Sequence, residues 1–137
     1  MVSQLGTLRP APEPLLRSAA MIDKLAGNRV FTYAEALETF PQVRDETDRA
    51  VKRMEALMGT LPSPTDMEGR KAQLDREYRR IVEEWAGVVT GMGCEVKGLW
   101  LVDWDCGDGY YCWRYPEEAL AHYHGYEEGF AGRVPIH

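Results

Sequence analysis

The spacing of apolar residues changes at Gly93, and this change constrains the fold of the 137-residue chain more than any other feature. Before Gly93, two segments at about 32–58 and 66–92 repeat apolar residues every three or four positions, which is typical of helices. A connector rich in Gly and Pro, from Gly59 to Thr65, separates them and predicts an antiparallel helical hairpin. After Gly93 the repeat shortens to every second residue, as in strands. The pattern predicts an α+β domain: a helical hairpin followed by a small three-stranded antiparallel sheet.

The first helix carries both a start signal and an interruption. Thr32 and Glu35 have the spacing of a capping box, in which each side chain bonds the backbone amide of the other residue. We therefore expect the helix to begin here. Pro41 falls inside the periodic segment, and because proline lacks an amide hydrogen it predicts a kink, or a break with a new helix starting at Pro41.

Two β-rich strings, 99–104 and 110–115, predict a β-hairpin with a five-residue loop from Asp105 to Gly109, and a third strand is expected around 119–123. Pairing Trp104 with Tyr110 places aromatic residues on both faces of the sheet, although the helices can cover only one face. A shift of one residue would exchange the partners. The second face must be covered by the C-terminal tail, by a second subunit in a homodimer, or by a ligand.

The chain divides into an N-terminal extension, residues 1–28, and a single α+β domain, residues 29–137. Three prolines before Leu15 predict an extended, partly disordered lead-in, and a short helix from about Leu15 to Ala26 is compatible with the sequence. Met21 is an alternative to Met1 as the biological start of the protein.

Composition and charge exclude several classes of partner. A formal net charge of -6 opposes nucleic acid, because phosphate-driven binding requires a basic surface. No apolar run approaches the roughly 18 residues of a membrane span, and no signal core is present near the N-terminus. Cys94, Cys106 and Cys112 lack Cys-x-x-Cys spacing, so neither a disulfide framework nor a thiolate zinc site is indicated. These observations predict a cytoplasmic protein without a membrane partner.

Several strings of the chain match the motifs of a known family. They are Phe31-Thr32-x-x-Glu35-Ala36 with Pro41 and Arg44, Gly93-Cys94-Glu95-Val96-Lys97, Leu101-Val102-Asp103-Trp104, Cys112-Trp113-Arg114 with Glu117, and His124 with Glu127-Glu128-Gly129-Phe130-Ala131-Gly132-Arg133-x-Pro135-Ile136. Over residues 29–136 the chain resembles a prokaryotic family known only as domain of unknown function 2203. The resemblance implies a small cytosolic protein and no particular activity. His122 departs from the family pattern, in which an apolar residue is usual at this position.

The C-terminal part contains a candidate metal site. His122 and His124 alternate on an expected strand and would project to one face, and Glu127 or Glu128 could fold back toward them. Two histidines and a carboxylate can bind catalytic zinc or non-haem iron, and manganese is a further candidate. The alternative is that these histidines are hydrogen-bonded to carboxylates or to the backbone at a sheet edge.

A second candidate is a site for a small anionic ligand. Arg114 and Glu117 can form an ion pair beside Trp113, and an arginine in such a setting can bind a carboxylate or a phosphate. Lys97 and Arg133 could join it. The alternative is a purely structural ion pair.

Two other chemistries have weaker support. The acidic loop that begins at Asp103 has Arg114 where a calcium loop requires a bidentate glutamate, and no spacing supports a cysteine nucleophile with His124 as base. Two functions therefore remain. The favoured one is a non-enzymatic binding or interaction module that uses the aromatic sheet face with Arg114, Glu117 and His124. The alternative is a small metal-dependent enzyme, hydrolase-like, with His124 and Glu127 as its central ligands.

Overall fold

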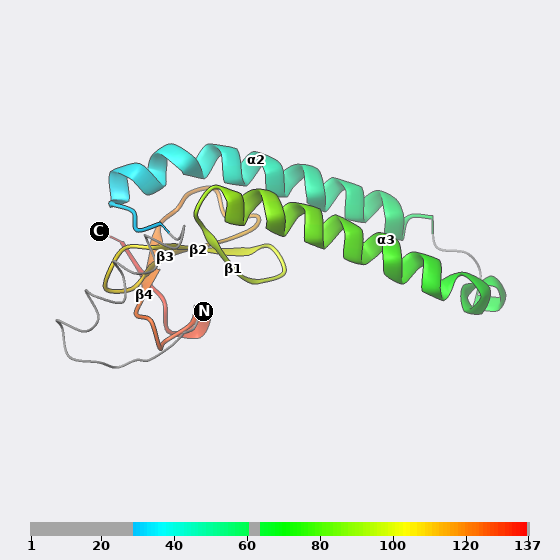
Figure 1. The fold of residues 1–137 in the computed structure, drawn as a ribbon. Helices are drawn as coiled ribbons and strands as arrows, with labels where there is room; N and C mark the ends of the chain where they lie inside the picture. Colours follow the sequence, from blue (N-terminus) through cyan, green and yellow to red (C-terminus); the bar gives the residue numbers. More distant parts are fainter. Residues whose placement is uncertain (1–28, 61–63, 137) are drawn as a thin grey trace.

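The computed structural model describes residues 29–60 and 64–136, so the predicted N-terminal extension and its short helix lie outside the described residues. Its elements, in chain order, are α2 (Tyr33–Met58), α3 (Pro64–Gly91), β1 (Glu95–Gly98), β2 (Leu101–Asp105), β3 (Tyr110–Arg114), β4 (His122–His124), the 3₁₀ helix η1 (Phe130–Gly132) and β5 (Val134–Pro135). The two helices lie side by side, and the sheet lies below the end of the hairpin at which α2 begins and α3 ends (Figure 1). The predicted α+β class, with a helical hairpin followed by an antiparallel sheet, is confirmed.

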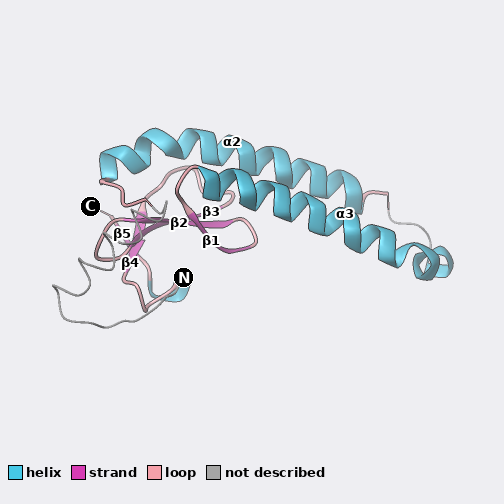
Figure 2. Cartoon of the chain, viewed as in Figure 1, coloured by secondary structure: helices cyan, strands magenta, loops and turns pink. Residues whose placement is uncertain are grey.

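The sheet has five strands rather than the predicted three, in the order β1-β2-β3-β4-β5, with every neighbouring pair antiparallel. Figure 2 draws these strands in magenta. The two additional strands, β1 and β5, lie at the edges and have only four and two residues. They lack the long apolar alternation that identifies a strand, and β5 includes Pro135, which cannot donate a ladder hydrogen bond. The predicted third strand corresponds to β4, which begins at His122.

Helix α2 begins as predicted and continues through its proline. The Oγ1 atom of Thr32 accepts a hydrogen bond from the amide of Glu35 at 3.1 Å, and the Glu35 carboxylate accepts one from the amide of Thr32 at 2.9 Å. The predicted break at Pro41 is wrong, because α2 is one helix from Tyr33 to Met58. Leu37, whose carbonyl loses its partner at Pro41, lies on the exposed side of the helix where water can replace that bond. Neither described helix is sufficiently long and apolar to cross a membrane.

The register of the β2–β3 hairpin differs by one residue from the predicted pairing. Asp105 pairs with Tyr110 and Trp104 with Tyr111, so the connecting loop has four residues, 106–109. The Asp105 carboxylate accepts a hydrogen bond from the amide of Gly107 at 2.9 Å, which closes this loop. Gly107 has a φ of 98°, a conformation that glycine adopts more readily than other residues. The observed register puts the largest apolar side chains of both strands on one face.

The core lies between that face and the helices. Val102, Trp104 and Trp113 of the sheet are fully buried against helical residues that include Phe40 and Trp85. The Phe40 ring lies 5.4 Å from the Trp113 ring in an edge-to-face arrangement. Because strand side chains alternate, the residues between these aromatics point to the opposite face of the sheet. That opposite face holds the polar side chains described next.

Candidate metal centre

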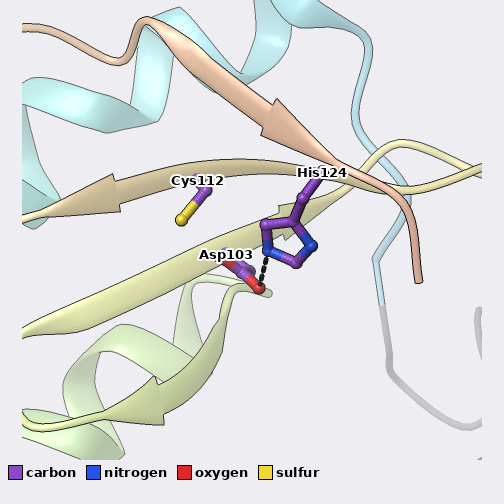
Figure 3. A group of neighbouring side chains, drawn as sticks. All are labelled: Asp103, Cys112 and His124. Atoms are coloured by element: carbon purple, nitrogen blue, oxygen red, sulfur yellow. Dashed lines mark hydrogen bonds and ion pairs between the residues drawn. The ribbon is translucent and has the colours of Figure 1, made fainter. Parts of the chain in front are cut away.

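Asp103, Cys112 and His124 meet on the face of the sheet that points away from the helices (Figure 3). They come from β2, β3 and β4, and Cys112 is the direct ladder partner of Asp103. A carboxylate oxygen, the thiol sulfur and a ring nitrogen all lie within 4.8 Å of one another. The three residues are only 1%, 0% and 3% exposed. Of the described residues, these three alone form a group of this kind, which makes them the candidate metal ligands.

Both nitrogens of the His124 ring face oxygen atoms. The Nδ1 atom lies 2.8 Å from the carbonyl oxygen of Gly125, and the Nε2 atom lies 2.9 Å from Oδ2 of Asp103. A carbonyl oxygen only accepts hydrogen bonds, so Nδ1 carries a hydrogen. Burial by itself lowers the pKa of His124, but the Asp103 carboxylate and the Gly125 carbonyl outweigh it and raise that pKa above its ordinary value. A cation, either a proton on Nε2 or a metal ion, therefore belongs between this nitrogen and the carboxylate.

Asp103 has unused capacity to bind a cation. Its Oδ2 atom faces His124 and lies 3.6 Å from the Nζ atom of Lys97, whereas its Oδ1 atom is buried and has no hydrogen-bond partner among the described residues. A buried carboxylate oxygen without a partner is unfavourable by about 1–3 kcal/mol. The neighbouring Cys112 thiol, which interacts with the Asp103 carboxylate, or a cation can supply the missing partner.

Cys112 is suited to be a metal ligand and unsuited to be a nucleophile. Burial, with a contribution from Asp103, raises the pKa of its thiol to about 12. The thiolate needed for nucleophilic attack is therefore scarce at neutral pH. A divalent cation can remove this thiol proton, because a coordinated cysteine is deprotonated. The predicted absence of a thiolate zinc site rested on Cys-x-x-Cys spacing, which does not detect a cysteine that joins ligands from other strands.

The remaining predicted metal ligands lie outside this group. His122 shares the sheet face of His124, as predicted, but is not among the three close residues. Glu128 accepts a hydrogen bond from the amide of Gly125 at 2.6 Å, so its carboxylate closes the turn after β4. Glu127 is exposed. The structure thus brings His124 together with Asp103 and Cys112, which the sequence did not identify as ligands.

In the predicted anion site, Arg114 and Arg133 share contacts with Glu117 and Phe130, whereas Lys97 has other partners. The Glu117 carboxylate forms a two-pronged ion pair with Arg133, not with the Arg114 side chain, and also accepts the backbone amide of Arg114 at 2.9 Å. The guanidinium groups of Arg114 and Arg133 both lie over the ring of Phe130. Lys97 lies 3.7 Å from the centre of the Tyr110 ring, and its charge is near Glu95 and Asp103. Trp113 is buried in the core and donates its indole hydrogen to the Glu117 carbonyl. Arg114, Glu117 and Arg133 therefore lie together around Phe130, whereas Lys97 lies beside Glu95 and Asp103.

A separate pocket of about 430 Å³ lies where α2 meets the end of β3. Trp113 and Glu117 contribute to its wall, but most of its charged lining is acidic. Asp45 and Asp48 in this lining are paired with Arg44 and Lys52. The pocket therefore does not favour an anion.

The polar sheet face is covered by the chain's own C-terminal segment. Tyr126 donates a hydrogen bond to the Asp105 carboxylate at 2.7 Å and packs edge-on against Tyr110. Arg133, the residue before β5, adds its ion pair with Glu117. The C-terminal tail, a second subunit and a ligand were the three possible covers for this face, and the tail is the one that the structure contains. The face therefore gives no separate reason to expect a homodimer.

Comparisons with known proteins place this arrangement in a family. No curated protein and no solved structure matches the chain. A family model described as an uncharacterized conserved protein, DUF2203, matches residues 29–136, which include both helices, the whole sheet and all three residues of the candidate metal centre. The chain therefore belongs to the DUF2203 family.

Proposed function

We propose that this protein is a non-enzymatic binding module for a divalent transition metal, held by Asp103, Cys112 and His124. The observation that carries the proposal is the His124 ring, with Nδ1 directed to a backbone carbonyl and Nε2 directed to a carboxylate. Histidines that bind metals usually donate their other ring hydrogen to a carbonyl or a carboxylate, which orients the ring. The Gly125 carbonyl supplies this orientation here and leaves Nε2 as the metal-binding atom.

The chemistry of the donors supports zinc as the preferred metal. A carboxylate and a thiolate together balance the two charges of the cation, so a neutral imidazole completes a donor set with no net charge. Lys97, which lies 3.6 Å from Oδ2 of Asp103, has the Glu95 carboxylate as its own partner. Such neutrality matters in a buried location, where an unbalanced charge is strongly unfavourable. Imidazole and thiolate suit zinc and iron, whereas manganese prefers oxygen ligands. Of the three metals considered from the sequence, zinc fits best and manganese least.

The burial of the donors supports a binding module over the hydrolase alternative. A catalytic metal keeps one coordination position open to water and substrate, whereas a structural metal is enclosed by protein. The three donor residues are at most 3% exposed. A metal held there would join β2, β3 and β4 rather than meet a substrate.

Zinc binding is the direct test. The protein would be purified without a histidine tag, stripped with a chelator and titrated with zinc sulfate, and the bound metal would be measured by elemental analysis. We expect one zinc ion per chain. A ligand at 100 times its dissociation constant stabilises a protein by about 2.7 kcal/mol, which for a domain of this size raises the melting temperature by about 10 °C.

Two cysteine variants give a matched comparison. Cys112→Ser removes the soft sulfur ligand with little change in volume, and we expect it to abolish most of the zinc-induced stabilisation. Cys106→Ser makes the same chemical change in the β2–β3 loop, outside the three-residue group, and should keep the full zinc response. Metal content well below one equivalent in the wild type, with no thermal shift, would show that His124 and Asp103 form a metal-free ion pair and would refute the proposal.

A further inference from the structure

Three protein donors leave a zinc ion one ligand short. Structural zinc sites are almost always four-coordinate and tetrahedral, and their ligands come from the protein. Building on the proposed metal-binding function, we propose that His122 supplies the fourth ligand. The complete site would then be Asp103, Cys112, His122 and His124, with donors from three adjacent strands.

The strand register places His122 beside the other ligands. Cys112 pairs with Asp103 on β2 and with His122 on β4, so these three residues form one row across the sheet. Directly paired residues of antiparallel strands project to the same face with their Cβ atoms about 4.5–5.5 Å apart. His124 lies on the same face, two residues further along β4. The fourth side chain therefore starts next to the thiol that it would join in the coordination sphere.

The His122 ring contains a buried atom that requires a partner. Its Nδ1 is buried and has no hydrogen-bond partner among the described residues. Within residues 29–60 and 64–136, the other buried side-chain atom without a hydrogen-bond partner is Oδ1 of Asp103, a residue of the metal group itself. Two unpartnered buried atoms within one row of three residues are unusual, because nearly all such atoms in folded proteins are hydrogen-bonded. A shared cation would satisfy both.

Binding requires the His122 side chain to rotate and the other three donors to draw closer together than the 4.8 Å within which they now lie. His122 does not belong to the group whose donor atoms lie within 4.8 Å of one another, so its ring must turn toward Cys112. Rotamer changes of this kind are common when a ligand binds, and they leave the backbone in place. His122 is also a neutral ligand, so its addition preserves the charge balance of the site.

Cobalt is a suitable probe, because Co²⁺ replaces zinc and its visible absorption depends on coordination number. The stripped, untagged full-length chain would be titrated with cobalt chloride. We expect the wild type to show the intense visible bands of four-coordinate cobalt together with a near-ultraviolet charge-transfer band from the Cys112 thiolate. If the wild type shows neither band, the proposed metal function fails and this inference fails with it.

Two variants separate the role of His122 from that of the site as a whole. His122→Leu removes the ring nitrogens and leaves an apolar side chain of similar size. We expect it to retain the thiolate band, to shift the visible bands because a water oxygen replaces the imidazole nitrogen, and to bind cobalt at least about tenfold more weakly. Glu127→Gln, a change at an exposed residue outside the group, should match the wild type.

Proton NMR of the cobalt-loaded wild type gives a second readout that does not depend on a variant. Two coordinated histidines give two strongly shifted, exchangeable imidazole N–H signals, and one coordinated histidine gives only one. A single signal, or a His122→Leu variant with the affinity and visible spectrum of the wild type, would overturn the assignment of His122. The proposed function would stand in that case, because the thiolate band reports metal bound at Cys112.

Discussion

A buried hydroxyl on α2 provides a measurable test of how the helical hairpin is held together. Thr47 is fully buried, and its Oγ1 atom accepts a hydrogen bond from the indole Nε1 of Trp85 at 2.8 Å. The same hydroxyl donates to the carbonyl oxygen of Val43 at 2.8 Å. Replacing Thr47 with valine keeps the side-chain shape but removes the oxygen. The Trp85 indole hydrogen is then left without this acceptor in the core.

The expected cost follows from the burial of both partners, since Trp85 is 3% exposed. A buried donor that loses its acceptor destabilises a protein by about 1–3 kcal/mol, so we expect Thr47→Val to lower the free energy of unfolding by about 2 kcal/mol. For a domain of this size that corresponds to a fall in melting temperature of about 8 °C. Replacing both partners with apolar groups removes the unpaired donor, so the effect of Thr47→Val should be smaller in a Trp85→Phe background.

Thr39 provides a matched control on the same helix. Its hydroxyl accepts the indole hydrogen of Trp104 at the same distance of 2.8 Å. Trp104 is itself fully buried, but Thr39 is half-buried, so water can approach the indole hydrogen from the Thr39 side. We expect Thr39→Val to cost about 1 kcal/mol or less. Urea unfolding followed by circular dichroism gives all of these free energies. Equal effects of the two threonine substitutions, or equal effects of Thr47→Val in both backgrounds, would refute the assignment of the cost to an unpaired indole.

Three further predictions concern backbone space and charge. Gly87→Ala on α3 should stabilise the protein by about 0.5–1 kcal/mol in urea unfolding, because the added methyl group meets nothing within 4 Å and alanine favours the helix. Gly109→Ala should cost about 1–3 kcal/mol in the same assay, since its Cβ would lie 2.7 Å from the backbone carbonyl oxygen of His124; a neutral result would contradict the tight approach of β3 to β4. Burial by itself raises the pKa of Glu117, but the Arg133 guanidinium and the Arg114 amide outweigh it and hold that pKa below its ordinary value. The ion pair therefore stabilises the protein above about pH 4.3, the ordinary pKa of glutamate, and this stabilisation is lost as the pH falls through the lowered pKa. Glu117→Gln should therefore cost about 1 kcal/mol at pH 7 and little near pH 3, and a cost independent of pH would rule out the charge as its cause.

The helical half of the fold could be predicted because its signals are local. The apolar repeat of α2 and α3 needs no knowledge of distant residues, and the capping box requires only Thr32 and Glu35. The effect of Pro41 was not predictable in the same way. Its cost depends on whether the carbonyl of Leu37 faces water or the core, which is decided by the packing of the whole helix.

The candidate metal site was missed because it depends on a register that the sequence leaves open. With Trp104 paired to Tyr110, Asp103 and Cys112 fall on opposite faces of the sheet, whereas the observed pairing makes them direct partners. Both faces contain aromatic residues, so apolar alternation alone could not select between the two registers. A usable signal was present in the loop, where Asp105 can close a four-residue turn by accepting the amide of Gly107. His124 was identified because imidazole is a common ligand wherever it occurs, but its partners could be found only in three dimensions.

The charges of Asp103, Cys112 and His124 can be balanced either with or without a metal ion, and this determines whether folding depends on the ion. Without metal, a protonated His124 balances the Asp103 carboxylate, the neighbouring Lys97 is balanced by Glu95, and Cys112 remains a neutral thiol. With a divalent ion, the carboxylate and a thiolate balance its two charges and the imidazole is neutral. Neither state leaves an uncompensated charge in the interior. The aromatic core between the helices and the sheet also lies on the other face of β2 and β3, so its packing does not require the ion. The chain should therefore fold before it binds metal, unlike a small zinc finger whose folding energy comes from the ion, and removal of the metal should lower its melting temperature without unfolding it.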